Sequence, residues 1–106
     1  MMKMNVVAFV GKVKEMPVLK ESNAGNKFAT MIMEVNRNFQ NSDGTLDTDK
    51  ISVTLWKGIA ETTINTCRPG DWISVKGRLQ AHEYEGRDGM MRSAYDIIAE
   101  RVSILQ

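Results

Sequence analysis

Alternating hydrophobic and polar residues predict extended strands along most of the chain. Residues 6–13 are β-branched and apolar, and residues 27–39 alternate apolar with polar side chains. Between them lies the turn-forming cluster 21–26, in which Gly25 is free to adopt a positive φ angle. We therefore expect two strands joined by a reversal of the chain.

Two further reversals are expected at Asp43-Gly44 and Asp88-Gly89, because such dipeptides between extended segments are strong hairpin signals. Residues 51–56 and 72–84 alternate cleanly and are expected to be half-buried strands. Residues 91–105 alternate poorly, as a strand does when it is bent or contacts another subunit.

One segment has a helical period instead. Ala60, Ile64 and Cys67 share one face of a short helix that begins near Gly58, and the segment 68–71, which contains Pro69 and Gly70, ends it. Its threonines are mediocre helix formers, so we expect the helix to be stabilised by docking on a sheet. Three strands, one helix and two strands is the order of the OB-fold. The predicted fold class is all-β, a five-stranded OB-fold barrel with one short helix between strands three and four.

Composition narrows the class of protein. A chain of 106 residues with 42% hydrophobic and 25% charged residues fits one globular domain, here residues 1–106. No apolar run approaches the roughly 20 residues that span a bilayer, so no membrane association is expected. Cys67 is the only cysteine, which excludes an intramolecular disulfide and fits a reducing cytoplasm. The formal net charge of +1 gives no global attraction for a polyanion, so any nucleic-acid binding must depend on a local arrangement.

The strand pattern suggests where such an arrangement lies. If Ile51, Val53 and Leu55 fill the core, Trp56 must point to the opposite face of its strand. In residues 72–84, the same argument places Ile73, Val75, Leu79 and Ala81 inside. It places these residues outside: Lys76, Arg78, Gln80, His82 and Tyr84. We expect the two strands to be neighbours that share a groove. Surfaces that combine cations with aromatic rings bind single-stranded nucleic acid, since cations follow phosphates and rings stack on bases.

A structural interpretation stays open at this point. A tryptophan on the second face of a strand is often covered by a helix or another subunit, and strand lysines and arginines are often simply solvated. Phe9 and Phe28 are expected to be packing residues, and Trp72 is expected to serve in packing or at an interface.

Catalysis has little support. His82 is the only histidine and Cys67 is expected on the buried side of the helix, so one chain offers no Cys/His pair or triad. Asp43, Asp47 and Asp49 share a hairpin but lack the glycine and final glutamate of a calcium-binding loop. We expect no enzyme activity, metal or cofactor.

Four segments together resemble bacterial single-stranded DNA-binding proteins, and the resemblance extends from Asn5 to Leu105. The segments are residues 5–13, 28–39, 53–57 and 69–79. The resemblance implies an OB barrel, a homotetramer, and sequence-independent coating of single-stranded DNA in replication, recombination or repair. By position, it implies base stacking on Phe39, Trp56 and Tyr84.

Phosphate contacts are expected from the cationic residues near these rings: Arg37, Lys50, Lys57, Lys76, Arg78 and Arg87. Lys50 stands where the family usually has another aromatic residue, which predicts weaker stacking and a stronger dependence on salt. The chain also stops at Gln106 without the acidic tip of longer members, so recruitment of repair enzymes through a tail is not expected.

Two other classes of function remain as alternatives. The first is a dimeric primosomal OB-fold adaptor that holds replication proteins. The second is a small nucleic-acid hydrolase, which would need divalent metal.

Overall fold

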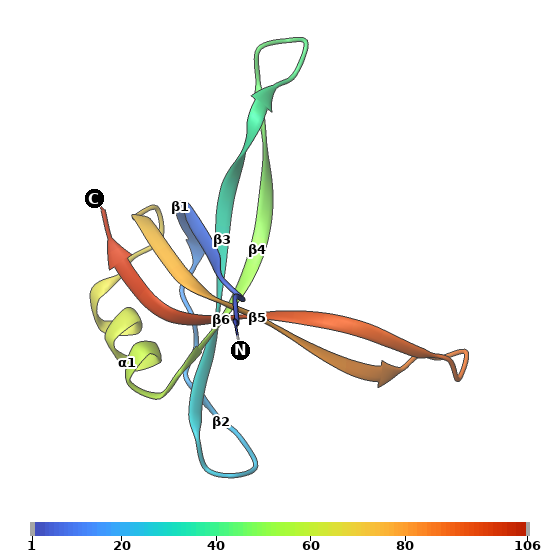
Figure 1. Ribbon diagram of the computed structural model, residues 1–106. Helices are drawn as coiled ribbons and strands as arrows, with labels where there is room; N and C mark the ends of the chain where they lie inside the picture. The colour runs from blue at the N-terminus through green and yellow to red at the C-terminus, as the bar shows by residue number, and fades with distance from the viewer. Residues whose placement is uncertain (1, 106) are drawn as a thin grey trace.

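The structure is a computed structural model that describes residues 2–105, and most of these residues lie in β-strands (Figure 1). The elements in chain order are β1 (Val7–Glu15), β2 (Lys20–Glu21), β3 (Lys27–Gln40), β4 (Leu46–Trp56), α1 (Lys57–Thr66), β5 (Trp72–Glu85) and β6 (Met91–Ile104).

Five of the strands close into a barrel. Their order is β1-β5-β6-β4-β3, and β1 pairs with β3 to complete the ring. β4 pairs with β6 in parallel, whereas the other pairings are antiparallel. β2 forms a short extra hairpin with β3, closed by a turn in which Gly25 has a φ angle of 83°. The predicted five-stranded barrel with one helix between its third and fourth strands is confirmed.

Apolar side chains from every barrel strand meet inside the barrel. The alternation correctly predicted Val53, Leu55, Ile73 and Val75 as core residues, and all four are buried. The other members of this core are Val13, Ala29, Met31, Met33, Ala60, Cys67 and Ala99. Ala60 and Thr63 are the buried residues of α1, so the helix is docked as expected on its apolar side.

Two glycines allow strands to approach closely in the barrel. A Cβ atom on Gly11 would overlap the carbonyl oxygen of Glu34, and a Cβ on Gly77 would overlap the carbonyl oxygen of Ile98. At Gly77 the β5–β6 register also shifts, so that β6 bulges near Glu100. This bulge accounts for the poor alternation of the last strand.

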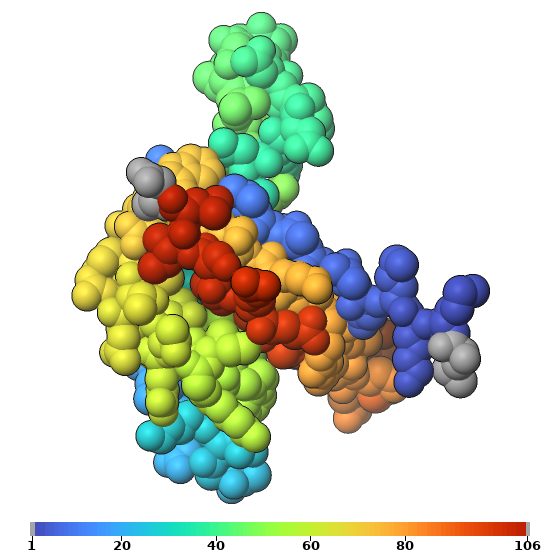
Figure 2. All heavy atoms as spheres, turned by 60° about the vertical axis from the view of Figure 1, so that its left-hand side comes forward, coloured from blue at the N-terminus to red at the C-terminus, as the bar shows by residue number. Residues whose placement is uncertain are grey.

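Two hairpins extend beyond the barrel as two-stranded arms (Figure 1). The β3–β4 arm (residues 36–50) and the β5–β6 arm (residues 79–97) turn at Gly44 and Gly89, whose φ angles are 86° and 77°. Both predicted hairpins are therefore confirmed. In the space-filling view the tip of the β3–β4 arm stands clear of the body (Figure 2).

Two expectations about β5 were wrong. Leu79 is 40% exposed and Ala81 is also exposed, because they lie in the β5–β6 arm, where one face of the two-stranded ribbon has no second layer over it. In addition, β5 is not a neighbour of β4, because β6 lies between them. A groove that joins residues of β4 and β5 must therefore cross β6.

Candidate nucleic-acid interface

Trp56 lies at the end of β4, outside the hydrophobic core. Its side chain is half-buried, and its ring packs at a tilt against Phe28, with 5.1 Å between the ring centroids. Phe28 is its direct partner on β3, so this contact follows from the strand register. Trp56 also lines a hollow of about 660 Å³, together with Lys57, Arg78 and Gln80. The predicted side of the strand is therefore correct for Trp56.

The hollow is lined by residues of β4 and β5 and extends across β6, which lies between these two strands. Ile98, Ala99 and Glu100 of β6 contribute to its lining, while Trp56 reaches it from β4 and Arg78 from β5. Arg78 donates a hydrogen bond of 2.7 Å from Nη1 to Oε1 of Gln80. Trp56 and Arg78 thus share a groove as expected, but β6 lies between their strands. The sequence pattern placed Gln80 on the outer face of its strand but did not predict that it lines this hollow. Glu100 was not predicted as a lining residue, because alternation along the sequence does not reveal the β6 bulge.

Lys57 makes the junction between β4 and α1. Its backbone is left-handed, with a φ angle of 52°, and this turns the chain from strand directly into helix. No side chain caps the first turn of α1, so backbone N–H groups remain free at the helix N-terminus. These N–H groups and the Lys57 ammonium both favour an anion near Trp56.

Lys76 lines a separate hollow on the outer surface of β1, β5 and β6. This hollow, of about 420 Å³, also includes Phe9, Val10 and Arg101. Arg101 is the register partner of Lys76 on β6 and adds a cation that the sequence analysis missed. The bulge after Lys76 separates this pair from Arg78.

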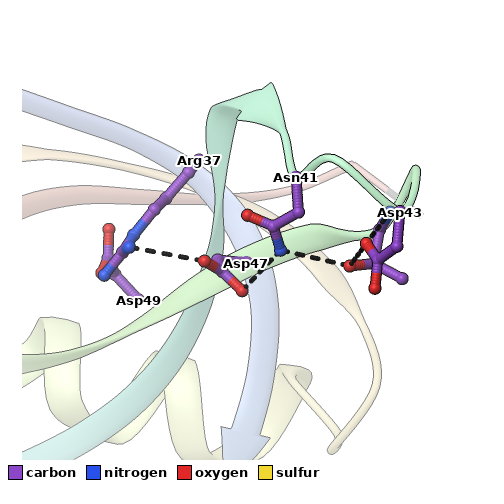
Figure 3. Close-up of polar contacts among 6 residues, drawn as sticks. Arg37, Asn41, Asp43, Asp47 and Asp49 are labelled. Atoms are coloured by element: carbon purple, nitrogen blue, oxygen red, sulfur yellow. Dashed lines mark hydrogen bonds and ion pairs between the residues drawn. The ribbon is translucent and has the colours of Figure 1, made fainter.

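On the β3–β4 arm, Phe39 is 64% exposed and lies beside Arg37. Arg37 is not a free cation, because it is paired with two carboxylates of the facing strand (Figure 3). Its hydrogen bond to Asp49 raises the pKa of the guanidinium further. The antiparallel hairpin around Asp43-Gly44 could have predicted this pairing, since it brings residues 37 and 49 to facing strands.

Lys50 lies at the base of the same arm, opposite Glu34. Glu34 instead pairs with Lys14 at 2.9 Å, which lowers the pKa of the Glu34 carboxyl and raises that of the Lys14 ammonium. Within residues 2–105, no ion pair involves Lys50. The same holds for Lys57, Lys76, Arg78 and Arg87.

Tyr84 lies on the β5–β6 arm and is 46% exposed. Its ring centroid is 6.4 Å from that of His82, which contacts Asp96 through Nδ1 at 3.2 Å. Arg87 is at the tip of this arm, where the neighbouring Asp88 is already paired with Arg92. The structure therefore distributes the three candidate rings over three elements: Trp56 on the barrel, Phe39 on one arm and Tyr84 on the other.

Cys67 and His82 were the residues considered for catalysis, and His82 contacts Asp96 rather than Cys67. Cys67 is buried, and desolvation raises the pKa of its thiol, which disfavours the thiolate nucleophile. In the described part of the chain, no group of three or more His, Cys, Asp or Glu side chains could hold a metal ion. No helix there is long and apolar enough to cross a membrane.

Comparison with known proteins gives the family. Residues 4–105 match the Single-strand binding protein family. The chain belongs to this family. It is 33% identical to Single-stranded DNA-binding protein B of Bacillus subtilis (strain 168), an alignment of 101 residues that covers 95% of this chain and 89% of that protein.

Longer relatives are matched only in part. Single-stranded DNA-binding protein 3 of Listeria innocua is 37% identical over 103 residues, which are 97% of this chain and 64% of that protein. The chain spans about half of the Enterococcus faecalis single-stranded DNA-binding protein, with 54% covered at 33% identity.

Among solved structures, the small single-stranded DNA-binding protein from Streptomyces coelicolor has the same fold. The TM-score is 0.72 at 21% identity, and the alignment covers 97% of this chain and 95% of that one. The predicted OB-fold is thereby confirmed. These relatives do not favour the primosomal adaptor.

Proposed function

We propose that this protein binds and protects single-stranded DNA without sequence preference and without catalysing a reaction. The observation that carries the proposal is the hollow lined by Trp56, Lys57 and Arg78, in which neither cation forms an ion pair with the residues that the structure describes. The names of its relatives point to the same ligand. This function belongs to replication, recombination or repair of DNA in the bacterial cytoplasm and nucleoid.

Binding combines stacking with phosphate contacts. One base stacks on Trp56, at about 1–3 kcal/mol per stacked base, and every base has a face that can stack. Arg78 and Lys57 then hold the adjoining phosphates. Phe39 and Tyr84 stack further bases, and Lys50, Lys76 and Arg87 contribute charge along the strand. Because the rings accept any base, this arrangement gives affinity without reading sequence.

The positions of the three rings require the single-stranded DNA to wrap around the protein. Phe39 lies on the β3–β4 arm and Tyr84 on the β5–β6 arm, whereas Trp56 is the last residue of β4, at the end of that strand away from the β3–β4 arm (Figure 1). A DNA strand that reaches all three rings must follow the surface of the barrel from one arm to the other.

We also propose that the protein assembles as a homotetramer, with the dimer as the smaller alternative. Support comes from apolar side chains that the single chain leaves exposed. Val10 is 54% exposed on β1, beside the hollow that Phe9 and Lys76 line. Tyr95 and Leu79 are likewise exposed on the β5–β6 arm, where their register partners are Ala81 and Ile97. A second copy could cover such surfaces.

A binding assay tests the proposed function. Fluorescence anisotropy should show that labelled oligo-dT and a mixed-sequence single strand bind with similar affinity, while the matching duplex binds far more weakly. The affinity for oligo-dT should fall with salt, with a log–log slope of about −0.7 per neutralised phosphate. Equal binding to duplex, or no binding to oligo-dT at low salt, would contradict the proposal.

A further inference from the structure

The β3–β4 arm carries more acidic than basic side chains. Among residues 36–50, Arg37 and Lys50 are cationic, while Asp43, Asp47 and Asp49 are anionic, which gives a formal net charge of −1. An arm that bound phosphates mainly through charge would need the opposite sign. The arrangement of these charges therefore needs a separate explanation.

Arg37 is held by the carboxylates opposite it. Its Nε and Nη2 both donate to Oδ1 of Asp49, at 3.1 and 2.9 Å, and its Nη1 lies 3.6 Å from Oδ2 of Asp47. All three side chains are about half exposed, so the pair is accessible to a ligand. Nevertheless, Asp49 occupies the Nε and Nη2 side of the guanidinium, and Asp47 lies near Nη1.

The same network continues to the tip of the arm (Figure 3). Asn41 donates from Nδ2 to Asp47 Oδ1 at 3.0 Å and to Thr45 Oγ1 at 3.1 Å. Thr45 in turn donates to Asp43 from its backbone N–H and its hydroxyl, at 3.0 and 2.7 Å. Asp47 is thus fixed from the other side, and the carboxylates that face Arg37 belong to an ordered array.

We propose that Asp49, together with Asp47, is a positioning residue that holds Arg37 away from DNA phosphates and so lowers the affinity of the β3–β4 arm for single strands. The proposal rests on the proposed function. A phosphate that contacts Arg37 competes with these carboxylates for the guanidinium, so the contact should release less bound counterion than one to a free arginine. Stacking on Phe39 then supplies most of the binding by this arm.

The Asp49→Asn variant tests this proposal, since it removes the charge and keeps the size of the side chain. Binding to oligo-dT is measured by anisotropy from about 50 to 200 mM salt. At low salt the variant should bind about two- to fivefold more tightly, the range expected when an exposed ion pair is removed. Its salt slope should be steeper by up to about 0.7 for each phosphate that gains Arg37.

Two comparisons separate this mechanism from a general effect of negative charge. Asp43→Asn removes the same charge from the same arm without touching Arg37, and it should change affinity and slope less. In an Arg37→Gln background, Asp49→Asn should give no gain, because no guanidinium is left to release. A gain of equal size in that background, or an equal gain from Asp43→Asn, would overturn the proposal.

Failure of this inference is distinct from failure of the proposed function. If the parent protein binds oligo-dT but Asp49→Asn binds equally or more weakly, only the role of Asp49 is wrong. If the parent does not bind oligo-dT at low salt, the proposed function itself is wrong, and with it this proposal. Thermal melting of each variant establishes that a change in affinity is not a loss of fold.

Discussion

Lys57 shows how one residue serves both the fold and the candidate site. Its left-handed backbone, with a φ angle of 52°, lets β4 end and α1 begin without a connecting loop. That conformation costs a residue with a side chain about 1–2 kcal/mol relative to glycine. The same position places Lys57 beside Trp56 at the start of the helix, where it lines the hollow and forms no ion pair with residues 2–105.

Lys57→Gly and Lys57→Ala separate these two roles. Glycine relieves the strained backbone and should raise the free energy of unfolding by up to about 1 kcal/mol, whereas alanine keeps the strain and should leave it nearly unchanged. Both variants lose the charge, so both should bind oligo-dT more weakly and with a shallower salt slope. Urea denaturation and anisotropy titrations measure the two effects. Unequal losses of binding would show that backbone geometry, not charge, is what Lys57 contributes.

At the residue scale, alternation identified which side of the strand Trp56 occupies because β4 is covered on one face by the core. The same argument failed for Leu79 and Ala81, because alternation reports which face is apolar but not whether anything covers it. The ion pairs of Arg37 were also missed. They depend on which residues of β3 and β4 face each other across the hairpin, and alternation within one strand does not report this.

At the scale of elements, the barrel depends on close contact between β5 and β6. Gly77 permits it, because its Cα faces the backbone of Ile98 where the register shifts. The site depends on the same contact, since β6 carries the residues that line the hollow between Trp56 and Arg78. A change that pushes β6 away from β5 should therefore affect both stability and binding.

Gly77→Ala tests this element. The added methyl group meets backbone that cannot move without opening the ladder, so unfolding should be easier by about 1–3 kcal/mol or more. Gly58→Ala is the matched control. No atom lies within 4 Å of the methyl group it would add, and alanine favours the helix by up to about 1 kcal/mol. Chemical denaturation of both variants should show changes of opposite sign, and equal stability of Gly77→Ala and the parent would contradict this view of the barrel.

The order of elements was predictable because strand period, turn dipeptides and the helix are all local signals. Glycine at 25, 44 and 89 does occupy the positive φ angles that such turns require. The position of β6 between β4 and β5 was not predictable by the same means. It depends on pairing between segments far apart in sequence, and the parallel β4–β6 contact involves only two register pairs, Val53 with Ile97 and Thr54 with Ile98.

At the scale of the whole molecule, a chain of net charge +1 must concentrate its cations where a strand passes. Within residues 2–105, the candidate cations without an ion pair lie on the barrel, at the base of the β3–β4 arm and at the tip of the β5–β6 arm, while Arg37 is paired with carboxylates of its own arm. Wrapping across several copies would multiply these local contacts, which makes assembly relevant to affinity.

Val10→Asp tests assembly. Val10 is exposed on β1, so a carboxylate there should leave the fold of one chain intact but oppose burial against a second copy. Light scattering should show a tetramer for the parent and a smaller species for the variant, with similar circular dichroism spectra. A parent that is monomeric at micromolar concentration would contradict the proposed assembly.

The central claim is that a base stacks on the exposed face of Trp56, and binding of oligo-dT by Trp56→Leu tests it most directly. Leucine retains apolar packing near Phe28 but cannot stack, so affinity should fall by about 5- to 150-fold, equivalent to one stacked base. Trp56→Phe should lose less affinity than Trp56→Leu. Trp72→Leu removes the other tryptophan and should bind oligo-dT with the affinity of the parent. A folded Trp56→Leu protein with the parent's affinity would contradict the account.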